Sequence, residues 1–256
     1  MNTSTTSRIA VVTGASRGLG KSMAIHLAER GVDVVLTYRS NEAEALQVVA
    51  RIAELGRKAI ALPLEVGDVK GFPAFAEALK ARLRDEWRRD SFDFLVNNAG
   101  VGAHAGFAET TEAQFDAMVN VHLKGTFFLT QTLLPLMADG GRILNVSSGL
   151  TRFTFPGYAA YAAMKGAVEV LTHYLARELG ARRITANVIA PGAIATDFGG
   201  GAVRDNPLVN QMIAGMTALG RVGLPDDIGG AVALLLSPEA QWINGQRIEV
   251  SGGMLL

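Results

Sequence analysis

The sequence predicts an α/β fold: a single Rossmann-type domain over residues 1–256, in which a doubly wound parallel sheet has helices on both faces. Short apolar, β-branched runs recur along the chain, and their nearly continuous apolar character is typical of strands covered on both sides. Longer segments with helical spacing of apolar residues separate them. Because strand and helix alternate about six times and crossovers are right-handed, a doubly wound sheet is the simplest topology.

The second predicted helix has the clearest boundaries. Asn41 can cap its start with Glu44 as the reciprocal partner, and Gly56 ends it. The residues expected to face the sheet from this helix are Ala45, Leu46, Val49, Ile52 and Leu55. The predicted strands are residues 9–13, 33–38, 59–64, 92–97, 142–147 and 185–189. The other predicted helices are residues 20–30, 72–87, 111–123, 161–180 and 226–236.

Composition excludes several classes of protein. With 49% hydrophobic and 19% charged residues, the chain can bury enough surface to fold. Its 24 basic and 24 acidic residues cancel, so its net charge does not attract nucleic acid. The absence of cysteine excludes disulfides and thiolate metal sites. Residues 1–7 lack the features of a signal peptide, and no apolar run is long enough to span a membrane. We therefore expect a cytoplasmic protein that binds neither membranes nor nucleic acid.

A glycine-rich turn follows the first predicted strand, with the spacing G-x-x-x-G-x-G. Glycines allow a tight turn and let the backbone approach a pyrophosphate, whose charge meets the unpaired N–H groups at the start of the next helix. An ordinary strand-to-helix turn is the alternative. The residues of this turn that we expect to contact a dinucleotide are Gly14, Ser16, Arg17, Gly18, Leu19 and Gly20.

Further motifs stand in order after this turn. The sequence Asn97-Asn98-Ala99-Gly100 follows the fourth predicted strand, a serine precedes a Tyr161-x-x-x-Lys165 motif, and Pro191-Gly192 follows the sixth strand. Together with the turn, these motifs resemble those of the short-chain dehydrogenase/reductase family, and the resemblance extends from Thr13 to Gly253. It implies a nicotinamide dinucleotide as cofactor and hydride transfer as the reaction.

The end of the second predicted strand favours NADP(H) over NAD(H). An NAD-binding fold usually has an acidic residue there that binds the ribose 2′-OH. This chain instead has Tyr38, Arg39 and Ser40, with no acid before Glu42. Arg39 and Ser40 can bind a 2′-phosphate, and Arg17 can supply a second positive charge. In the family this combination is typical of members that prefer NADP. The alternative is that both arginines are solvated surface residues.

The resemblance implies further cofactor contacts. Glu65-Val66 corresponds to a pair that contacts adenine, although the family usually has Asp in place of Glu65. The small residues after the fourth strand would let the cofactor lie close to the backbone, although the asparagines can also have a purely structural role. A turn after the sixth strand would close over the nicotinamide. The contacts expected in these two segments are Asn98, Ala99, Gly100, Pro191, Gly192, Ile194 and Thr196.

Tyr161 and Lys165 lie four residues apart and so share one face of a helix. Tyrosine has a pKa of about 10 and is a poor proton donor at neutral pH. A neighbouring ammonium, with the positive nicotinamide of the oxidised cofactor, favours the phenolate and lowers that pKa. The resemblance implies that Tyr161 protonates the nascent alkoxide and that Lys165 binds the nicotinamide ribose. A buried tyrosine beside a lysine with an exposed ammonium is the alternative.

Two residues complete the predicted catalytic group. Ser148 is expected to hydrogen-bond the substrate carbonyl, whereas Ser147 is expected to have a structural or cofactor-lining role. Asn120 matches the fourth catalytic residue of the family and would hold a water beside Lys165. The predicted catalytic residues are therefore Asn120, Ser148, Tyr161 and Lys165. The four histidines lack the spacing of a metal site, so no metal is expected.

Aromatic residues between Ser148 and Tyr161 are expected to form an apolar wall, which points to a hydrophobic ketone. These residues are Phe153, Phe155 and Tyr158. Residues 193–220 are expected to form a substrate lid, because three consecutive glycines give backbone freedom and two methionines adapt to a ligand. A mobile surface loop is the alternative.

The sequence therefore predicts an NADPH-dependent reductase that transfers hydride to a ketone or a 3-oxoacyl carbonyl. An NAD(P)⁺-dependent dehydrogenase of an alcohol, polyol or steroid is one alternative. A noncatalytic dinucleotide-binding sensor is another, although it would not need the serine, tyrosine and lysine together. The C-terminal pattern resembles that of tetrameric family members. Leu255 and Leu256 would be an exposed apolar tail in a monomer, so we expect a homotetramer.

Overall fold

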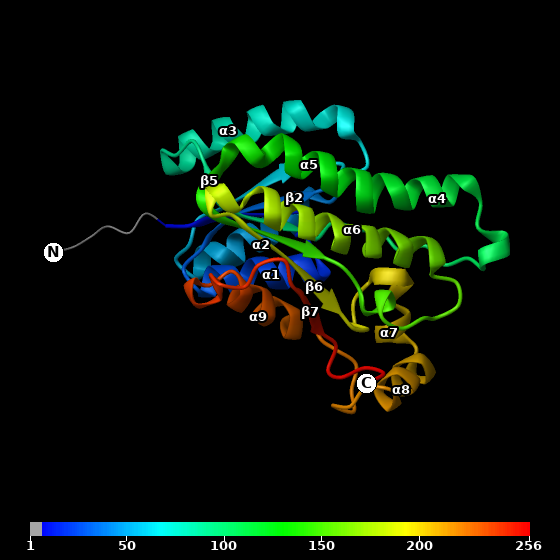
Figure 1. Cartoon of the computed structure of the whole chain (residues 1–256). Helices are drawn as coiled ribbons and strands as arrows, with labels where there is room; N and C mark the ends of the chain where they lie inside the picture. The colour runs from blue at the N-terminus through cyan, green and yellow to red at the C-terminus, as the bar shows by residue number, and fades with distance from the viewer. Residues whose placement is uncertain (1–6) are drawn as a thin grey trace.

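The computed structural model describes residues 7–256, which form a seven-stranded parallel sheet with helices around it (Figure 1). The strand order is β3-β2-β1-β4-β5-β6-β7. The strands are β1 (Ile9–Val12), β2 (Asp33–Tyr38), β3 (Ala59–Pro63), β4 (Phe92–Asn97), β5 (Met137–Val146), β6 (Thr185–Pro191) and β7 (Arg247–Val250). This confirms the predicted fold class. The prediction about a signal peptide concerns residues 1–7, of which residues 1–6 lie outside the described part of the chain.

Helices cover both faces of the sheet (Figure 1). One layer contains α1 (Gly18–Glu29), α2 (Glu42–Glu54) and α9 (Pro225–Leu235). The other contains α3 (Phe72–Trp87), α5 (Gly125–Leu133) and α6 (Ala159–Glu178), with α4 (Glu112–Met118) leading into α5. Near the carboxyl ends of β6 and β7 lie α7 (Ala202–Asp205) and α8 (Pro207–Gly215). Within residues 7–256, we find no helix with the length and apolar character needed to cross a membrane.

The structure adds elements that the sequence analysis did not predict. β7 has only four residues, and its alternation of charged and apolar side chains lacks the continuous apolar character of the other strands, because it pairs only with β6 at the edge of the sheet. β5 begins at Met137 rather than at residue 142, and the helical segment that begins after Thr111 continues through α5 to Leu133. Residues 193–220 contain α7 and α8.

Helix α2 confirms the predicted cap but corrects the predicted apolar face. Asn41 Oδ1 accepts a hydrogen bond from Glu44 N at 3.2 Å. Leu46, which was expected to face the sheet, is 52% exposed, whereas Val48 is fully buried. Because the helix has about 3.6 residues per turn, Val48 shares a face with Ala45 and Ile52, and Leu46 lies outside it.

Two buried asparagines join the middle of the sheet to the helices above it. Asn97 Nδ2 on β4 donates to Asn145 Oδ1 on β5 at 2.8 Å and to Thr130 Oγ1 on α5 at 3.0 Å. Asn145 Nδ2 in turn donates to Thr172 Oγ1 on α6 at 2.8 Å. These bonds satisfy polar groups that would be costly to bury unpaired. They also fix α6 relative to the ends of the two central strands.

Gly125, at the start of α5, packs directly against the backbone after β3. A Cβ at this position would overlap Val66 O and lie 3.0 Å from Asn120 O. We therefore expect Gly125→Ala to lower the free energy of unfolding by about 1–3 kcal/mol through overpacking. Chemical denaturation measures this change.

The matched control is Gly166→Ala, because Gly166 lies inside α6 and a Cβ there would meet no atom within 4 Å. Alanine should stabilise that helix by up to about 1 kcal/mol. Equal effects of the two substitutions would contradict the packing argument.

Candidate active site

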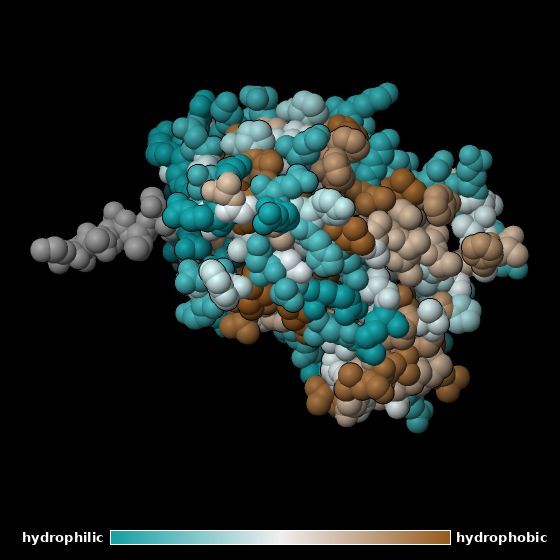
Figure 2. All heavy atoms as spheres, in the orientation of Figure 1, coloured by the Kyte–Doolittle hydropathy of each residue, from teal (hydrophilic) through white to brown (hydrophobic). Residues whose placement is uncertain are grey.

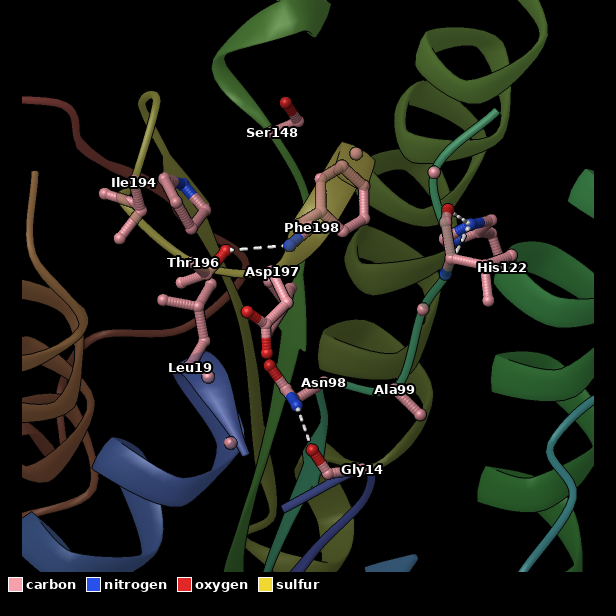
Figure 3. Close-up of a pocket in the computed structure, with 18 of the residues that line it drawn as sticks. Gly14, Leu19, Asn98, Ala99, His122, Ser148, Ile194, Thr196, Asp197 and Phe198 are labelled. Atoms are coloured by element: carbon pink, nitrogen blue, oxygen red, sulfur yellow. Dashed lines mark hydrogen bonds between the residues drawn. The ribbon is translucent and has the colours of Figure 1, made fainter. Parts of the chain in front are cut away.

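A cavity of about 750 Å³ lies at the carboxyl edge of the sheet (Figure 3). Its walls come from the segments that follow β1 to β6, because parallel strands end at the same edge and bring distant residues together. β1 and β4 are neighbours in the sheet. From β1 the chain continues to β2 and β3 on one side of this pair, and from β4 it continues to β5, β6 and β7 on the other. All the predicted cofactor contacts line this cavity, as do Ser148, Tyr161 and Lys165. Asn120 does not line it.

The glycine-rich turn between β1 and α1 forms an open cradle. Gly14 and Gly18 have φ angles of +62° and +56°, which glycine adopts without strain. A Cβ at Gly20 would overlap Gly14 O and lie 2.6 Å from Asn98 Nδ2. The first N–H groups of α1 donate no hydrogen bond to the side chain of the N-cap residue, Arg17. These donors are therefore available to an anion such as a pyrophosphate.

Asn98 holds the glycine-rich turn against the end of β4. Its Nδ2 donates to Thr13 O at 2.9 Å and to Gly14 O at 3.1 Å, as Figure 3 shows for Gly14. The Thr13 hydroxyl accepts hydrogen bonds from the backbone N–H groups of Asn98 and Ala99, both at 3.0 Å. Asn98 thus has the structural role that the sequence analysis kept as an alternative. Its backbone still lines the cavity beside the turn.

Two arginines lie where the adenosine end of a dinucleotide is expected. Arg39 Nε lies 3.4 Å from Glu65 Oε2, and Arg17 Nη1 lies 3.7 Å from Asp197 Oδ2. All four side chains are about half exposed or more, so these pairs are weak and an incoming phosphate can compete with them. No acidic residue occupies the end of β2. The uncapped helix start and the two arginines fit a phosphorylated dinucleotide.

Tyr161 and Lys165 lie side by side on the first turns of α6, and both are buried. Lys165 Nζ donates to Val146 O at 2.7 Å and lies 5.5 Å from the centroid of the Tyr161 ring. The helix thus places the ammonium group under the carboxyl end of β5. Ser148 follows this strand, and its Oγ accepts a hydrogen bond from Leu150 N at 3.2 Å.

Burial determines the protonation of this pair. Loss of contact with water raises the pKa of Tyr161 above its ordinary value, while the nearby Ser148 hydroxyl opposes this shift. Burial also lowers the pKa of Lys165 to about 8. In the protein without cofactor, the cost of burying the phenolate is the largest influence on the pKa of Tyr161. The expected lowering of this pKa by Lys165 together with an oxidised nicotinamide stays a prediction.

Ser147 has a structural role. It is 2% exposed, and its Oγ donates to Glu169 Oε1 on α6 at 2.6 Å. Arg247, from the unpredicted strand β7, donates to the same oxygen at 2.8 Å and to Ser148 O at 3.3 Å. These bonds hold the backbone of Ser148 between α6 and the edge of the sheet.

Asn120 lies in a π-helical turn, Val119–Lys124, between α4 and α5. Its carbonyl accepts a hydrogen bond from Gly125 N, and its side chain is half-buried. His122, two residues later, lines the cavity instead, and sequence reasoning considered it only as a metal ligand. Within residues 7–256, no three His, Cys, Asp or Glu side chains are grouped so that they could hold a metal ion.

Aromatic side chains contribute to the lining of the cavity. The rings of Phe153 and Phe155 have centroids 5.7 Å apart, and Tyr158 also lines the cavity. The sequence analysis did not single out Phe198, whose ring lies 5.7 Å from that of Tyr161. A Cβ at Gly102 would lie 3.2 Å from Phe198 Cε1, so this ring packs on the opposite wall. Tyr161 is thus bordered by an aromatic side chain of the opposite wall.

The segment of residues 193–220 also contributes to the lining of the cavity. Thr196 Oγ1 accepts a hydrogen bond from Phe198 N at 3.2 Å, which orders the start of the segment (Figure 3). The three glycines at 199–201 all have φ between +62° and +78°. Only glycine adopts such a series of left-handed residues readily. The segment can therefore change direction sharply before α7.

Known proteins resemble this chain over nearly its full length. A family model described as enoyl-(acyl carrier protein) reductase matches residues 14–255. The tetrahydroxynaphthalene reductase PfmaG of Pestalotiopsis fici is 36% identical, over 96% of this chain and 91% of that protein. The structure of LugOII, a promiscuous reductase that catalyses keto-reduction at C1 during lugdunomycin biosynthesis, has a TM-score of 0.93 at 38% identity, covering 98% and 99% of the two chains. That of LanV, an angucycline C-6 ketoreductase with bound NADP, has a TM-score of 0.92 at 39% identity, covering 97% and 95%.

The burial of Lys165 should affect stability in a pH-dependent manner. Because its pKa is lowered to about 8 on folding, the unfolded chain binds more protons between about pH 8 and the ordinary lysine range. The free energy of unfolding of the wild type, relative to Lys165→Met, should therefore rise as the pH is raised from 8 to about 9.5. Urea unfolding of both proteins measures the difference.

Lys124→Met provides the control, since Lys124 is exposed on the π-helical turn. Its difference from the wild type should not change over this range. A Lys165→Met difference that stays constant or falls with pH would show that the fold does not destabilise the ammonium.

Proposed function

This chain belongs to the short-chain dehydrogenase/reductase family, and on that premise we propose that it reduces a ketone on an aromatic ring system, with NADPH as hydride donor and Tyr161 as general acid. One observation carries the proposal: a single cavity joins the phosphate cradle after β1 to the buried Tyr161–Lys165 pair and to an aromatic wall. The enzyme is an oxidoreductase, and its solved relative LanV binds NADP.

Three side chains carry the chemistry that we propose. Bound NADPH supplies a hydride to the carbonyl carbon. The Ser148 hydroxyl donates a hydrogen bond to the carbonyl oxygen and stabilises the charge that develops there. The Tyr161 hydroxyl transfers its proton to this oxygen, and the phenolate regains a proton from solvent. Lys165 remains within reach of the phenol and stabilises the phenolate.

The relatives favour the reductive direction. A tetrahydroxynaphthalene reductase and an angucycline ketoreductase match this chain over nearly its full length. We therefore favour the reductase over the alcohol dehydrogenase that uses the same residues. Because burial raises the pKa of Tyr161, the phenol carries its proton at neutral pH. We also propose that Asn120 belongs to the catalytic group with Ser148, Tyr161 and Lys165. It would act through the π-helical turn in which it lies.

The aromatic lining indicates the class of substrate. Phe153, Phe155 and Phe198 line the cavity, and the Phe198 ring lies 5.7 Å from that of Tyr161. Such surfaces favour stacking and edge-to-face contacts with a flat ring system. Two relatives act on such compounds by name: a tetrahydroxynaphthalene reductase and an angucycline ketoreductase. A 3-oxoacyl thioester is the second candidate, favoured by the description of the matching family model.

The other predictions from the sequence enter the proposal. Residues 193–220 form the substrate lid, supported by the contact of Phe198 with Tyr161. The fold acts as one domain. A homotetramer is supported by exposed apolar side chains near α8 and the C-terminus, where Figure 2 shows hydrophobic residues gathered; Leu208 is 78% exposed and Leu256 96%. The cytoplasmic location remains a prediction.

Tyr161→Phe tests the proposed acid. Removing the hydroxyl should lower kcat by about 10²–10⁴-fold, because proton transfer to the alkoxide loses its donor. The dissociation constant of NADPH should stay within about twofold, since the ring remains. Oxidation of NADPH is followed by its absorbance with a panel of aromatic ketones and 3-oxoacyl thioesters.

The control is Tyr174→Phe, because Tyr174 lies on the same helix but is 63% exposed. This variant should turn over as the wild type does. Full activity of Tyr161→Phe would assign the acid to another residue, and no turnover by the wild type with any ketone would refute the proposed function.

Arg39→Asp tests the cofactor assignment. A carboxylate at this position would repel the 2′-phosphate and remove a charged hydrogen-bond donor, so NADPH should bind about 10–100-fold more weakly. NADH, which lacks this phosphate, should bind equally well or better. Dissociation constants for both cofactors, measured by nicotinamide fluorescence, give the comparison.

Arg51→Asp is the matched control, because Arg51 is an exposed arginine on α2 that pairs with Glu54 away from the cavity. It should change neither dissociation constant. Equal losses for NADPH and NADH in Arg39→Asp would refute the contact between Arg39 and the phosphate.

A further inference from the structure

His122 is a buried polar residue of the active site for which the proposed mechanism has no role. It lies in the π-helical turn between α4 and α5 and lines the cavity, although its side chain is only 1% exposed to solvent. Its ring packs on Gly100, where a Cβ would lie 2.8 Å from His122 Cε1. The imidazole therefore fits at this position because Gly100 has no side chain.

The hydrogen bond at one ring nitrogen determines the state of the other. Nε2 lies 2.7 Å from Val101 O and 3.4 Å from Val101 N (Figure 3). We assign the proton to Nε2, which then donates to the carbonyl, because two acceptor atoms would repel each other at the shorter distance. Nδ1 then has no proton and presents a lone pair. Burial, followed by the charge of Lys165, lowers the pKa of His122 to about 3, so the ring is neutral over the working range of an enzyme.

The Nδ1 lone pair has no hydrogen-bond partner among residues 7–256. An unsatisfied buried acceptor of this kind costs about 1–3 kcal/mol, so its presence calls for an explanation. The surroundings provide one. The His122 ring meets the Tyr161 ring edge to face, with centroids 5.1 Å apart and planes at 89°. The charge of Lys165 acts on His122 as well.

We propose that His122 is a positioning residue of the reductase, which gives the Tyr161–Lys165 pair a hydrogen-bond acceptor at Nδ1 while its ring holds the phenol in place. The donor that we infer is the Lys165 ammonium, acting through a water, because the His122 ring and Lys165 Nζ both lie against the Tyr161 ring, 5.1 and 5.5 Å from its centroid. This interaction adds to the hydrogen bond with Val146 O in keeping the ammonium beside the phenol. The inference rests on the proposed function, and His122 itself transfers no proton.

The substitutions that separate the two ring nitrogens are His122→Asn and His122→Gln. Asparagine places an amide close to the position of Nδ1, whereas glutamine places it close to that of Nε2. His122→Phe keeps an aromatic ring and removes both nitrogens. We expect kcat with an aromatic ketone to fall by about 10–100-fold in His122→Phe and His122→Gln, because the reacting groups are misplaced. His122→Asn should stay within about fivefold of the wild type.

In the same variants, KM and the dissociation constant of NADPH should change by less than about threefold, because His122 acts through Tyr161 and Lys165 rather than on the ligands. The matched control is His173→Asn on the exposed side of α6, which should leave all constants unchanged. If His122→Phe is unstable, the comparison of the asparagine and glutamine variants still decides the question. Wild-type kcat in His122→Gln, or equal losses in the asparagine and glutamine variants, would overturn the inference.

A second measurement needs no substrate. In ¹⁵N-labelled enzyme with NADP⁺ bound, the ring resonances of His122, assigned by their loss in His122→Asn, should show a protonated Nε2 and an unprotonated Nδ1. Lys165→Met should shift the Nδ1 resonance, and Lys124→Met should not. A protonated Nδ1, or no response to Lys165→Met, would overturn the inference. If instead the wild type reduces no ketone, the proposed function fails, and this spectrum still decides whether Nδ1 accepts a hydrogen bond that depends on Lys165.

Discussion

The burial of Tyr161 and Lys165 under the carboxyl ends of the central strands is the constraint on which the active site depends. Removal from water makes both charged forms costly, so the tyrosine keeps its proton and the lysine releases its proton more readily than in solution. The buried bond from Asn145 to Thr172 holds α6 against β5, and this packing places Lys165 under Val146 O. The same contacts that stabilise the fold therefore keep the phenol of Tyr161 protonated beside Lys165.

The π-helical turn extends this constraint to a second element. The turn brings His122 against Tyr161, and the ring fits because residue 100 is glycine. Its anchoring on Val101 leaves one nitrogen lone pair inside the site. Phe198 covers the tyrosine from the segment after β6, which also contributes Asp197 to an ion pair with Arg17 in the glycine-rich turn. The segment after β6 and the glycine-rich turn are thus in contact, through an exposed ion pair that an anion can displace.

Much of the fold and most of the cavity lining could be predicted from local sequence. The strands that are buried on both faces have continuous apolar runs, and the helices between them have their own periodicity, so six of the seven strands were expected close to where they lie. β7 was not predicted, because an edge strand of four residues has no such apolar run. Leu46 was assigned to the wrong face because its hydrophobicity does not determine where the axis of α2 lies relative to the sheet.

By itself, the sequence determined the order of strands and helices, the glycine-rich cradle, the lack of an acid after β2 and the pairing of Tyr161 with Lys165 on one helix face. These features depend on residue type and short spacing, which local backbone geometry converts directly into structure. The tertiary structure decided which side chains are buried away from solvent. It put His122 rather than Asn120 on the cavity wall, brought Phe198 onto the tyrosine and buried the tyrosine, which raises its pKa in the protein without cofactor. Burial depends on all the elements that pack around a side chain, and no short stretch of sequence contains them.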